Sequence, residues 1–455
     1  MVPGLRRLSC VVTARWFFAL VVVCLAASVT NADTVRFLPG NVESFQARLD
    51  LMAAAERRLD VVYFWVDQDT IARQFVETMR QAAERGVQVR FVVDDMHNKM
   101  SAAQQVDLLL AGVEIRVFHP RGGGLRTLLH RMHDKFLAAD QRRMIVGSRN
   151  IEDGYYGASS PCHSYVDIDC LVEGAIVADA CCYFEQLWES CHIVPLRACK
   201  GTVVDDCPLP KHGGVAQEFP WLEGCLGKLG SPTFEIESKC LDFVHDYSGS
   251  KTRGCGIAPD LYRVLDSAQH SIVLVTPYFL PANELGHVIR RALDRGVHVC
   301  VLTNSMQSTN RPIQYAGLLN VSKRYTRKGL DVWEFSGPET LHAKAFVVDG
   351  CIAGITSFNF NRRSAMTDTE VGLVIYDPAA AQHLEATLWC LFQKSSPHVP
   401  AGLGGRLAYR RGAKVRGETP TRPPSRLPRT NKGERVGVVR VRALRAGARL
   451  IPRQL

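Results

Sequence analysis

Two segments of the chain carry the same spaced set of histidine, lysine and aspartate. Alternate side chains of a β-strand point to the same face, so His-x-Lys on a strand presents both groups together. Lysines neutralise phosphoryl oxygens, one imidazole can attack phosphorus, and a second can protonate the leaving oxygen. The pattern predicts phosphodiester chemistry by six catalytic residues: His133, Lys135, Asp140, His342, Lys344 and Asp349.

A short polar turn follows each set at the same distance. The turns are Gly147-Ser148-Arg149-Asn150 and Thr356-Ser357-Phe358-Asn359. Serine hydroxyl and asparagine amide groups can donate hydrogen bonds to phosphoryl oxygens, or they can stabilise only their own turns. Beside the His-Lys pairs we predict the first role for Ser148, Asn150, Ser357 and Asn359.

Carboxylates are expected to support the histidines. A nucleophilic imidazole needs an acceptor on its other ring nitrogen, which sets the tautomer. Asp169 and Glu370 lie on the strand expected after each polar turn and are predicted to orient the imidazoles. Asp140 and Asp349, at the end of each motif, are expected to fix the strand end behind the site.

We expect the site to need no metal and no cofactor. Two half-sites that meet at an interface already supply both imidazoles. His130 lies three residues before His133, but no third ligand at suitable spacing accompanies this pair.

The motifs belong to a longer internal repeat. Gly86-Val87 corresponds to Gly296-Val297, Gly112-Val113 to Gly329-Leu330, and His133 to His342. The intervals are 210, 217 and 209 residues. A shared order at nearly constant spacing indicates two copies of one module. We predict an α/β fold with modules at residues 33–195 and 256–396, packed about a pseudo-twofold axis with one active site at their interface.

Within each copy the pattern predicts a β-sheet flanked by helices. In the first copy we expect a helix that is capped by Asn41 and runs to Met52, and a strand over 59–65. A helix over 70–85 that stops at Gly86 and a buried strand over 87–93 follow. This β-α-β alternation, with continuous apolar strands, requires sheets covered by helices.

The residue composition at both ends of the chain predicts contact with a membrane. Residues 1–32 are interpreted as a signal peptide or N-terminal anchor, because three arginines precede or adjoin a 14-residue apolar run, Trp16–Val29. We therefore expect an exported, periplasmic or otherwise extracytoplasmic, membrane-associated protein. Residues 397–455 hold 15 Lys and Arg against 2 Asp and Glu. This Pro- and Arg-rich tail is predicted to be disordered and either binds an anionic membrane surface or is only solvated.

Charge and cysteines narrow the remaining possibilities. The whole chain has a net charge of +10 and the tail alone has +13, so residues 1–396 have a net charge of −3. This negative charge disfavours a nucleic-acid partner. With 46% hydrophobic and 22% charged residues, the chain is neither disordered nor a multi-span membrane protein. Residues 196–255 form a Cys- and Gly-rich connecting insertion, whose five cysteines could form disulfides or remain thiols. They are Cys199, Cys207, Cys225, Cys240 and Cys255.

The duplicated motif resembles that of the phospholipase D superfamily. Gly147-Ser148-Arg149-Asn150-Ile151, Tyr165-Val166-Asp167-Ile168-Asp169 and Thr303-Asn304-Ser305 extend the resemblance, which covers most of residues 38–396 and looks most like the C-type bacterial cardiolipin synthases and related phosphatidyltransferases. The resemblance implies two phospholipase D-type modules, phospholipid substrates, and transfer of a phosphatidyl group through a phosphohistidine to an alcohol. His133 would be the nucleophile and His342 the general acid.

Three positions depart from the family pattern. Thr356 stands where glycine is usual, so the second phosphate-binding turn is expected to be distorted or slightly narrowed. Asp134 should point to the opposite strand face and have no effect on the site. Asp368 occupies a position that is often asparagine.

Four functions are compatible with the residues. The first is a phosphatidyltransferase, with cardiolipin as the expected product. The second is a phospholipase D that uses water and yields phosphatidic acid. The third is a phosphodiesterase that cuts nucleic acid, and the fourth is a non-catalytic protein that keeps the pocket to recognise phosphate.

Overall fold

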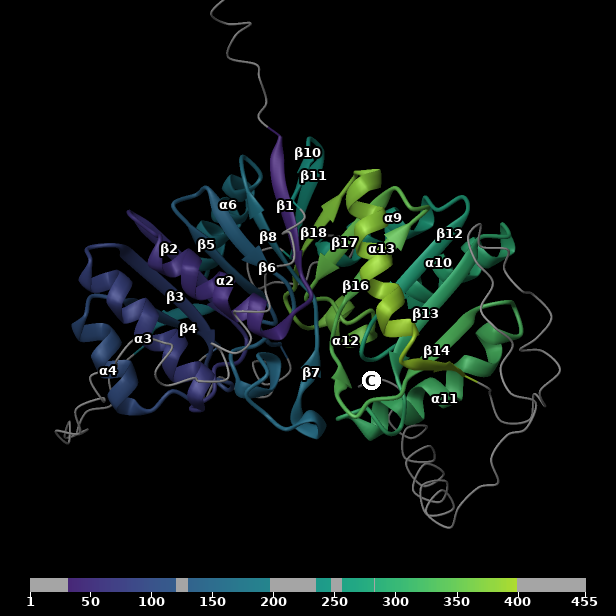
Figure 1. Cartoon of the computed structure of the whole chain (residues 1–455), viewed down its shortest axis with the longest axis horizontal. Helices are drawn as coiled ribbons and strands as arrows, with labels where there is room; N and C mark the ends of the chain where they lie inside the picture. The colour runs from purple at the N-terminus through teal and green to yellow at the C-terminus, as the bar shows by residue number, and fades with distance from the viewer. Residues whose placement is uncertain (1–31, 120–129, 197–234, 247–255, 282, 399–455) are drawn as a thin grey trace, which may run out of the picture.

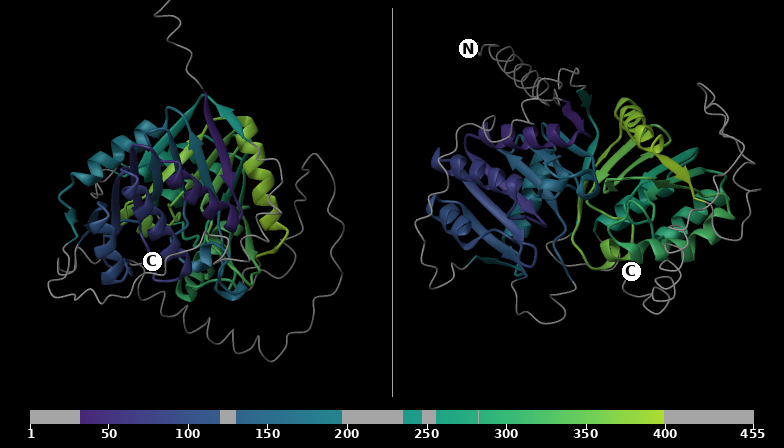
Figure 2. Two further views of the ribbon diagram at one scale, coloured as in Figure 1. Left: turned by 60° about the vertical axis from the view of Figure 1, so that its left-hand side comes forward. Right: turned by 60° about the horizontal axis from the view of Figure 1, so that its bottom comes forward.

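The computed structural model describes residues 32–119, 130–196, 235–246, 256–281 and 283–398. These residues form two α/β modules that lie side by side (Figure 1; Figure 2, right). The N-terminal apolar run, the basic tail beyond His398, and four of the five cysteines of the connecting stretch lie outside the described residues. None of the described helices is long and apolar enough to cross a membrane.

The first module is built on a nine-stranded mixed sheet. Its strands are β1 (Asp33–Leu38), β2 (Arg58–Tyr63), β3 (Gln88–Asp94), β4 (Glu114–Phe118), β5 (Lys135–Ala139), β6 (Arg143–Val146), β8 (Asp169–Glu173), β9 (Ile193–Pro195) and β10 (Ile236–Ser238). Its helices are α2 (Asn41–Ala53), α3 (Thr70–Glu84), α4 (Ala102–Leu110) and α6 (Val177–Trp188), with 3₁₀ turns η1 (Asp153–Tyr155) and η2 (Pro161–His163). The strand order is β10-β1-β8-β6-β5-β2-β3-β4-β9, and only β2, β3 and β4 are mutually parallel.

The second module repeats this arrangement on an eight-stranded sheet. Its strands are β11 (Leu241–His245), β12 (Ser271–Val275), β13 (His298–Asn304), β14 (Asp331–Phe335), β16 (Ala345–Val348), β17 (Ile352–Thr356), β18 (Val371–Ile375) and β19 (Ser395–Pro397). Its helices are α9 (Ile257–Asp266), α10 (Asn283–Asp294), α11 (Pro312–Thr326), α12 (Arg362–Met366) and α13 (Pro378–Phe392). The order β11-β18-β17-β16-β12-β13-β14-β19 matches the first sheet, and β12, β13 and β14 are the parallel strands. The prediction of two similar modules with mixed sheets flanked by helices is therefore confirmed.

Helix α3 forms because its apolar residues recur at helical spacing. Ile71, Phe75 and Met79 are fully buried on one face, and the Asp69 side chain caps the first turn by accepting the Ala72 N–H. Gly86, with φ of +92°, ends the helix where predicted.

Helix α2 begins at Asn41, but the prediction that Asn41 caps it is wrong. Gly40 is the N-cap residue. The Asn41 amide instead donates to the carbonyl of Tyr165 and accepts from Arg149, so it ties the helix to the strands near the site. Such long-range partners are invisible in a local pattern.

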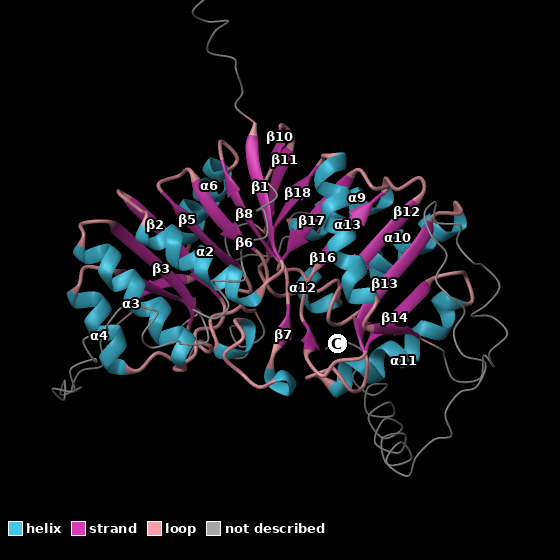
Figure 3. Cartoon of the chain, viewed as in Figure 1, coloured by secondary structure: helices cyan, strands magenta, loops and turns pink. Residues whose placement is uncertain are grey.

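The two modules share one hydrophobic core. The outer face of each sheet packs on its own helices, whereas the inner faces contribute to a common cluster that contains Phe136 and Ile168 of the first module and Leu302 and Leu341 of the second. Helix α6 of the first module contacts β11, and α13 of the second contacts β10. Figure 3 shows the two sheets with helices on their flanks. The modules therefore fix each other's position.

The described part of the connecting insertion, predicted over residues 196–255, supplies one strand to each sheet. Strand β10 pairs with β1 at the edge of the first sheet, and β11 pairs with β18 at the edge of the second. Residues 235–246 thus belong to both sheets, and β19 extends the second module to Pro397. Cys240, the one described cysteine of the predicted disulfide set, forms no disulfide with another described residue.

Asp140 and Asp349 have the same structural role in the two modules. Each aspartate directly follows a strand and has φ above +50°. Its carboxylate accepts hydrogen bonds from three backbone N–H groups at and just before the start of the neighbouring strand. Asp140 accepts from residues 56–58 and Asp349 from residues 269–271. Asp140 lies five residues after Lys135, about 16 Å along an extended strand. The expectation that Asp140 and Asp349 fix the strand ends is therefore confirmed, and their place in the predicted catalytic set is wrong.

Replacing Asp140 with alanine should lower the free energy of unfolding by about 1–3 kcal/mol, because three backbone donors lose their acceptor. Burial raises the pKa of Asp140, but the N–H groups outweigh it and leave the pKa below its usual value. The stabilisation is therefore present above about pH 4 and is lost as the pH falls further. Denaturant unfolding of wild type and Asp140→Ala at pH 7 and pH 3 measures both effects. If the variant lost the same free energy of unfolding at pH 7 and at pH 3, the account would be contradicted.

Candidate active site

The His-Lys segments of the two modules meet where the modules exchange backbone hydrogen bonds. Strand β7 (Tyr165–Val166) of the first module pairs with β15 (Thr340–Leu341) of the second at the centre of the molecule (Figure 1). His342 N then donates to the Val166 carbonyl at 2.8 Å. Reciprocally, His133 N donates to the Thr369 carbonyl at 3.0 Å. Each histidine is therefore held by the backbone of the other module.

The carboxylates that contact the two imidazoles are also crossed between the modules. His133 Nδ1 lies 2.8 Å from Glu370 Oε2, and His342 Nδ1 lies 2.7 Å from Asp167 Oδ2. Both carboxylates are fully buried, and the histidines are 8% and 6% exposed. An Nδ1–H that donates to a carboxylate leaves the Nε2 lone pair for chemistry.

The prediction that Asp169 orients a histidine is wrong. Asp169 is the first residue of β8 and is held by Arg48 at 2.8 Å and Arg149 at 3.0 Å, deep in the first module. Asp167, two residues earlier in the short link between β7 and β8, reaches His342. Asp167 lies 19 residues after Ser148, whereas Glu370 lies 13 after Ser357. The longer connection in the first copy, which holds η1, η2 and β7, hides this equivalence in the sequence.

Ser148 and Ser357 bind the carboxylates of the site, and their role as phosphate donors stays a prediction. The Ser148 hydroxyl donates to Asp167 Oδ1 and the Ser357 hydroxyl donates to Glu370 Oε2, each at 2.5 Å. A hydroxyl has only one proton to donate, and here it is used within the protein. Each serine thus holds the carboxylate of its own module, which in turn holds the histidine of the other.

Asn150 and Asn359 keep unsatisfied groups at the site. The Oδ1 atom of each is buried and without a hydrogen-bond partner among the described residues. The Asn150 amide nitrogen donates to Tyr155 Oη at 3.1 Å. Substrate binding by the two asparagines remains a prediction.

The two lysines lie beside the imidazoles as the motif predicts. Lys135 Nζ donates to the His133 carbonyl at 2.6 Å, and Lys344 Nζ donates to the His342 carbonyl at 2.8 Å. Burial lowers the pKa of Lys135 to about 7 and that of Lys344 to about 8. A bound phosphodiester would supply the missing negative charge and favour the protonated lysines.

The same environment keeps both imidazoles neutral at pH 7. Burial lowers the pKa of His133 well below its usual value, and the charges of Lys135 and Lys344 lower it further. Burial and Lys344 lower the pKa of His342 to about 4, although Asp167 opposes the shift. Two unprotonated Nε2 atoms are therefore available in the free protein.

Gly147 and Thr356 occupy equivalent turns, and each fits the residue opposite it. A Cβ atom at Gly147 would lie 1.9 Å from Asp169 Oδ1, so this position requires glycine. In the second module Thr356 faces Gly372, and its hydroxyl donates to the Val371 carbonyl at 2.8 Å. The expected distortion of the second turn is therefore offset by a glycine on the neighbouring strand.

The other two departures from the family pattern also have partners. Asp134 is fully buried and accepts a hydrogen bond from the Tyr183 hydroxyl on α6 at 2.5 Å, and burial raises the pKa of Asp134 to about 7. Asp368 binds Arg363 at 2.7 Å. Neither of these hydrogen bonds is made to a motif histidine or lysine.

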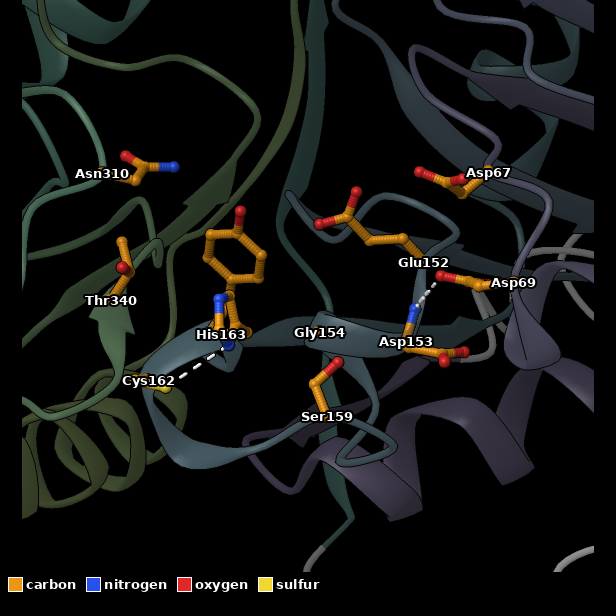
Figure 4. A pocket seen from close by; sticks show the side chains of 11 residues that line it. Asp67, Asp69, Glu152, Asp153, Gly154, Ser159, Cys162, His163, Asn310 and Thr340 are labelled. Carbon is orange, nitrogen blue, oxygen red and sulfur yellow. Dashed lines mark hydrogen bonds between the residues drawn. The ribbon is translucent and has the colours of Figure 1, made fainter.

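An acidic cavity of about 290 Å³ borders the site (Figure 4). Tyr165 and Thr340, which pair in the central two-stranded sheet, form part of its wall, and Asp69 and Glu152 face it. Burial raises the pKa of Asp69 to about 6 and that of Glu152 to about 7, and neighbouring carboxylates add to both shifts. Such an acidic lining is unfavourable for phosphate.

The described residues contain no cluster of three or more His, Cys, Asp or Glu side chains that could hold a metal ion. His130, the one neighbour considered as a partner ligand for His133, instead has its Nδ1 3.0 Å from the Thr367 carbonyl.

Known proteins share this chain's modules and fold. The family model described as cardiolipin synthase, PLD-like domain, matches residues 49–188 and 261–391. The chain is 28% identical over 394 residues to cardiolipin synthase C of Escherichia coli (strain K12), which covers 76% of this chain and 82% of that protein. It is 24% identical over 404 residues to the probable cardiolipin synthase YwiE of Bacillus subtilis (strain 168), with coverages of 87% and 72%.

A solved structure supports the same conclusion about the fold. Phosphatidylserine synthase of Haemophilus influenzae Rd KW20 superposes with a TM-score of 0.62 at 16% identity, over 83% of this chain and 91% of that one. These comparisons confirm the resemblance inferred from the duplicated motif.

Replacing Asp169 and Asp167 should separate their two roles. Asp169→Ala leaves Arg48 and Arg149 buried without their counter-charge and should cost about 3–5 kcal/mol of folding free energy. Asp167→Asn keeps the shape of the side chain and should cost markedly less. Denaturant unfolding of both variants measures the difference, and a larger loss for Asp167→Asn would contradict the assignment.

Proposed function

The chain belongs to the cardiolipin synthase, PLD-like domain family and is an enzyme of the phospholipase D superfamily, and we propose that it transfers a phosphatidyl group to an alcohol through a phosphohistidine, with cardiolipin as the product. The relatives named above are cardiolipin synthases, which implies phospholipid substrates. The observation that carries the mechanism is the pair of buried imidazoles, each with Nδ1 on a buried carboxylate and each beside a buried lysine.

In the first half-reaction the anionic phosphodiester binds between Lys135 and Lys344. Its negative charge raises the pKa of His342, which takes up a proton on Nε2. His133 Nε2 attacks phosphorus, the P–O bond to the leaving alcohol breaks, and His342 gives its proton to the departing oxygen.

In the second half-reaction His342 acts as the base and His133 is the leaving group. The incoming alcohol gives its proton to His342 Nε2 while its oxygen attacks phosphorus. The P–N bond to His133 breaks, and the free imidazole returns. Glu370 and Asp167 stabilise the positive charge that His133 and His342 carry in turn.

We also propose that the enzyme is exported and works at a membrane surface. The apolar run of residues 16–29 supports export, and the excess of 13 positive charges beyond residue 396 supports attraction to anionic lipid.

The test is lipid mass spectrometry after the purified protein is incubated with phosphatidylglycerol vesicles. Wild type should form cardiolipin. His133→Ala should lower the rate by at least about 10³-fold, because it removes the nucleophile. His342→Ala should lower it by about 10²–10⁴-fold, the usual contribution of a general acid–base group.

His270→Ala is the matched control, since His270 is exposed in a turn and should leave the rate unchanged. Phosphatidic acid without cardiolipin would favour the hydrolase. Absence of product from several phospholipids would contradict the proposal and favour the nuclease or phosphate-binding function.

A further inference from the structure

The two motif histidines have different surroundings at the nitrogen that reacts. His342 Nε2 lies 3.2 Å from the hydroxyl of Tyr155 and 3.1 Å from Lys344 Nζ. His133 instead has the ring of Phe64 edge-on at a centroid distance of 4.8 Å, and its Nε2 makes no hydrogen bond within the described parts of the chain. The motif is duplicated, but the Nε2 environment is not.

The hydrogen bonds around Tyr155 run in one direction. The Asn150 amide donates to Tyr155 Oη at 3.1 Å, so the phenol oxygen is an acceptor there. His342 Nδ1 donates to Asp167, so Nε2 of the neutral ring is an acceptor as well. The Tyr155 hydroxyl therefore has its proton free to donate to His342 Nε2, a nitrogen that Lys344 Nζ also contacts at 3.1 Å.

Tyr155 is held rigidly enough to act as a fixed reference for His342. Its side chain is 3% exposed, and its ring stacks on Tyr165 at 4.2 Å with an angle of 12° between the planes. Both rings contact the His342 ring edge-on, at 5.0 and 5.6 Å. Asp69 holds η1 in place by accepting the Asp153 N–H.

The sequence repeat places no counterpart of Tyr155 next to His133. Tyr155 lies seven residues after Ser148, and the residue seven after Ser357 is Ser364. Ser364 Oγ accepts the Asn359 N–H at 3.1 Å. A serine side chain also lacks the reach of a phenol.

We propose that Tyr155 is a positioning residue that orients His342 Nε2 for proton exchange with the leaving and incoming alcohols. This inference rests on the proposed function. The hydrogen bond between the Tyr155 hydroxyl and Nε2 sets the orientation of the His342 ring in the free protein, and it forms again once the proton has passed to the leaving oxygen. Tyr155 keeps its own proton throughout, and burial raises its pKa well above the usual value.

The test compares two leaving groups in the first turnover of Tyr155→Phe. Phosphatidylglycerol releases an alkyl alcohol, which needs a proton from His342, whereas phosphatidyl-p-nitrophenol releases a phenolate that needs none. In rapid-quench experiments, Tyr155→Phe should slow glycerol release by about tenfold and p-nitrophenol release by less than about twofold. A role confined to folding would affect both substrates alike.

Tyr156→Phe is the matched control. Tyr156 adjoins Tyr155, is fully buried, and has a hydroxyl without a partner among the described residues, so its removal should change neither rate. An equal loss on both substrates in Tyr155→Phe, or no loss on either, would overturn the role of Tyr155 alone. Failure of the wild type to cleave either substrate would overturn the proposed function and this inference with it.

Discussion

The reciprocal pairing of one module's carboxylate with the other module's histidine is the interaction on which the site depends. Glu370 holds His133 and Asp167 holds His342, and the backbone hydrogen bonds of Thr369 and Val166 set both distances. Neither module alone contains both a motif histidine and the carboxylate that binds its Nδ1. The common core between the sheets is therefore a requirement of the chemistry as well as of stability.

Burying these groups is costly unless every charge is compensated. Asp167 and Glu370 are fully buried, and each accepts a serine hydroxyl in addition to its histidine. Burial raises the pKa of Asp167, but His342, Lys344 and Arg149 outweigh it and keep the carboxyl ionised. Burial keeps both imidazoles neutral, and the charges of Lys135 and Lys344 add to this effect.

Much of the fold and of the site could be predicted from local patterns, because duplication and the alternation of strand side chains both determine the spacing of residues in the sequence. The two modules, the mixed sheets, and the lysines beside His133 and His342 followed from the motif. What could not be predicted depends on contacts across the module boundary. Asp167 was missed because the first copy has a longer connection before its strand, and the serine hydroxyls bind carboxylates that are distant in sequence. Tyr155 has no counterpart in the second copy and so fell outside the repeat.

The most direct test of this account is the rate at which the phosphohistidine forms in Glu370→Gln, measured by rapid quench with radiolabelled phospholipid. Glu370 lies in the second module, yet it is paired with His133 of the first. The account predicts that formation slows by about 10²–10⁴-fold, the range expected when a catalytic histidine loses its carboxylate. Glu237→Gln, an exposed change on β10, should have no effect. Formation at the wild-type rate in Glu370→Gln would contradict the account.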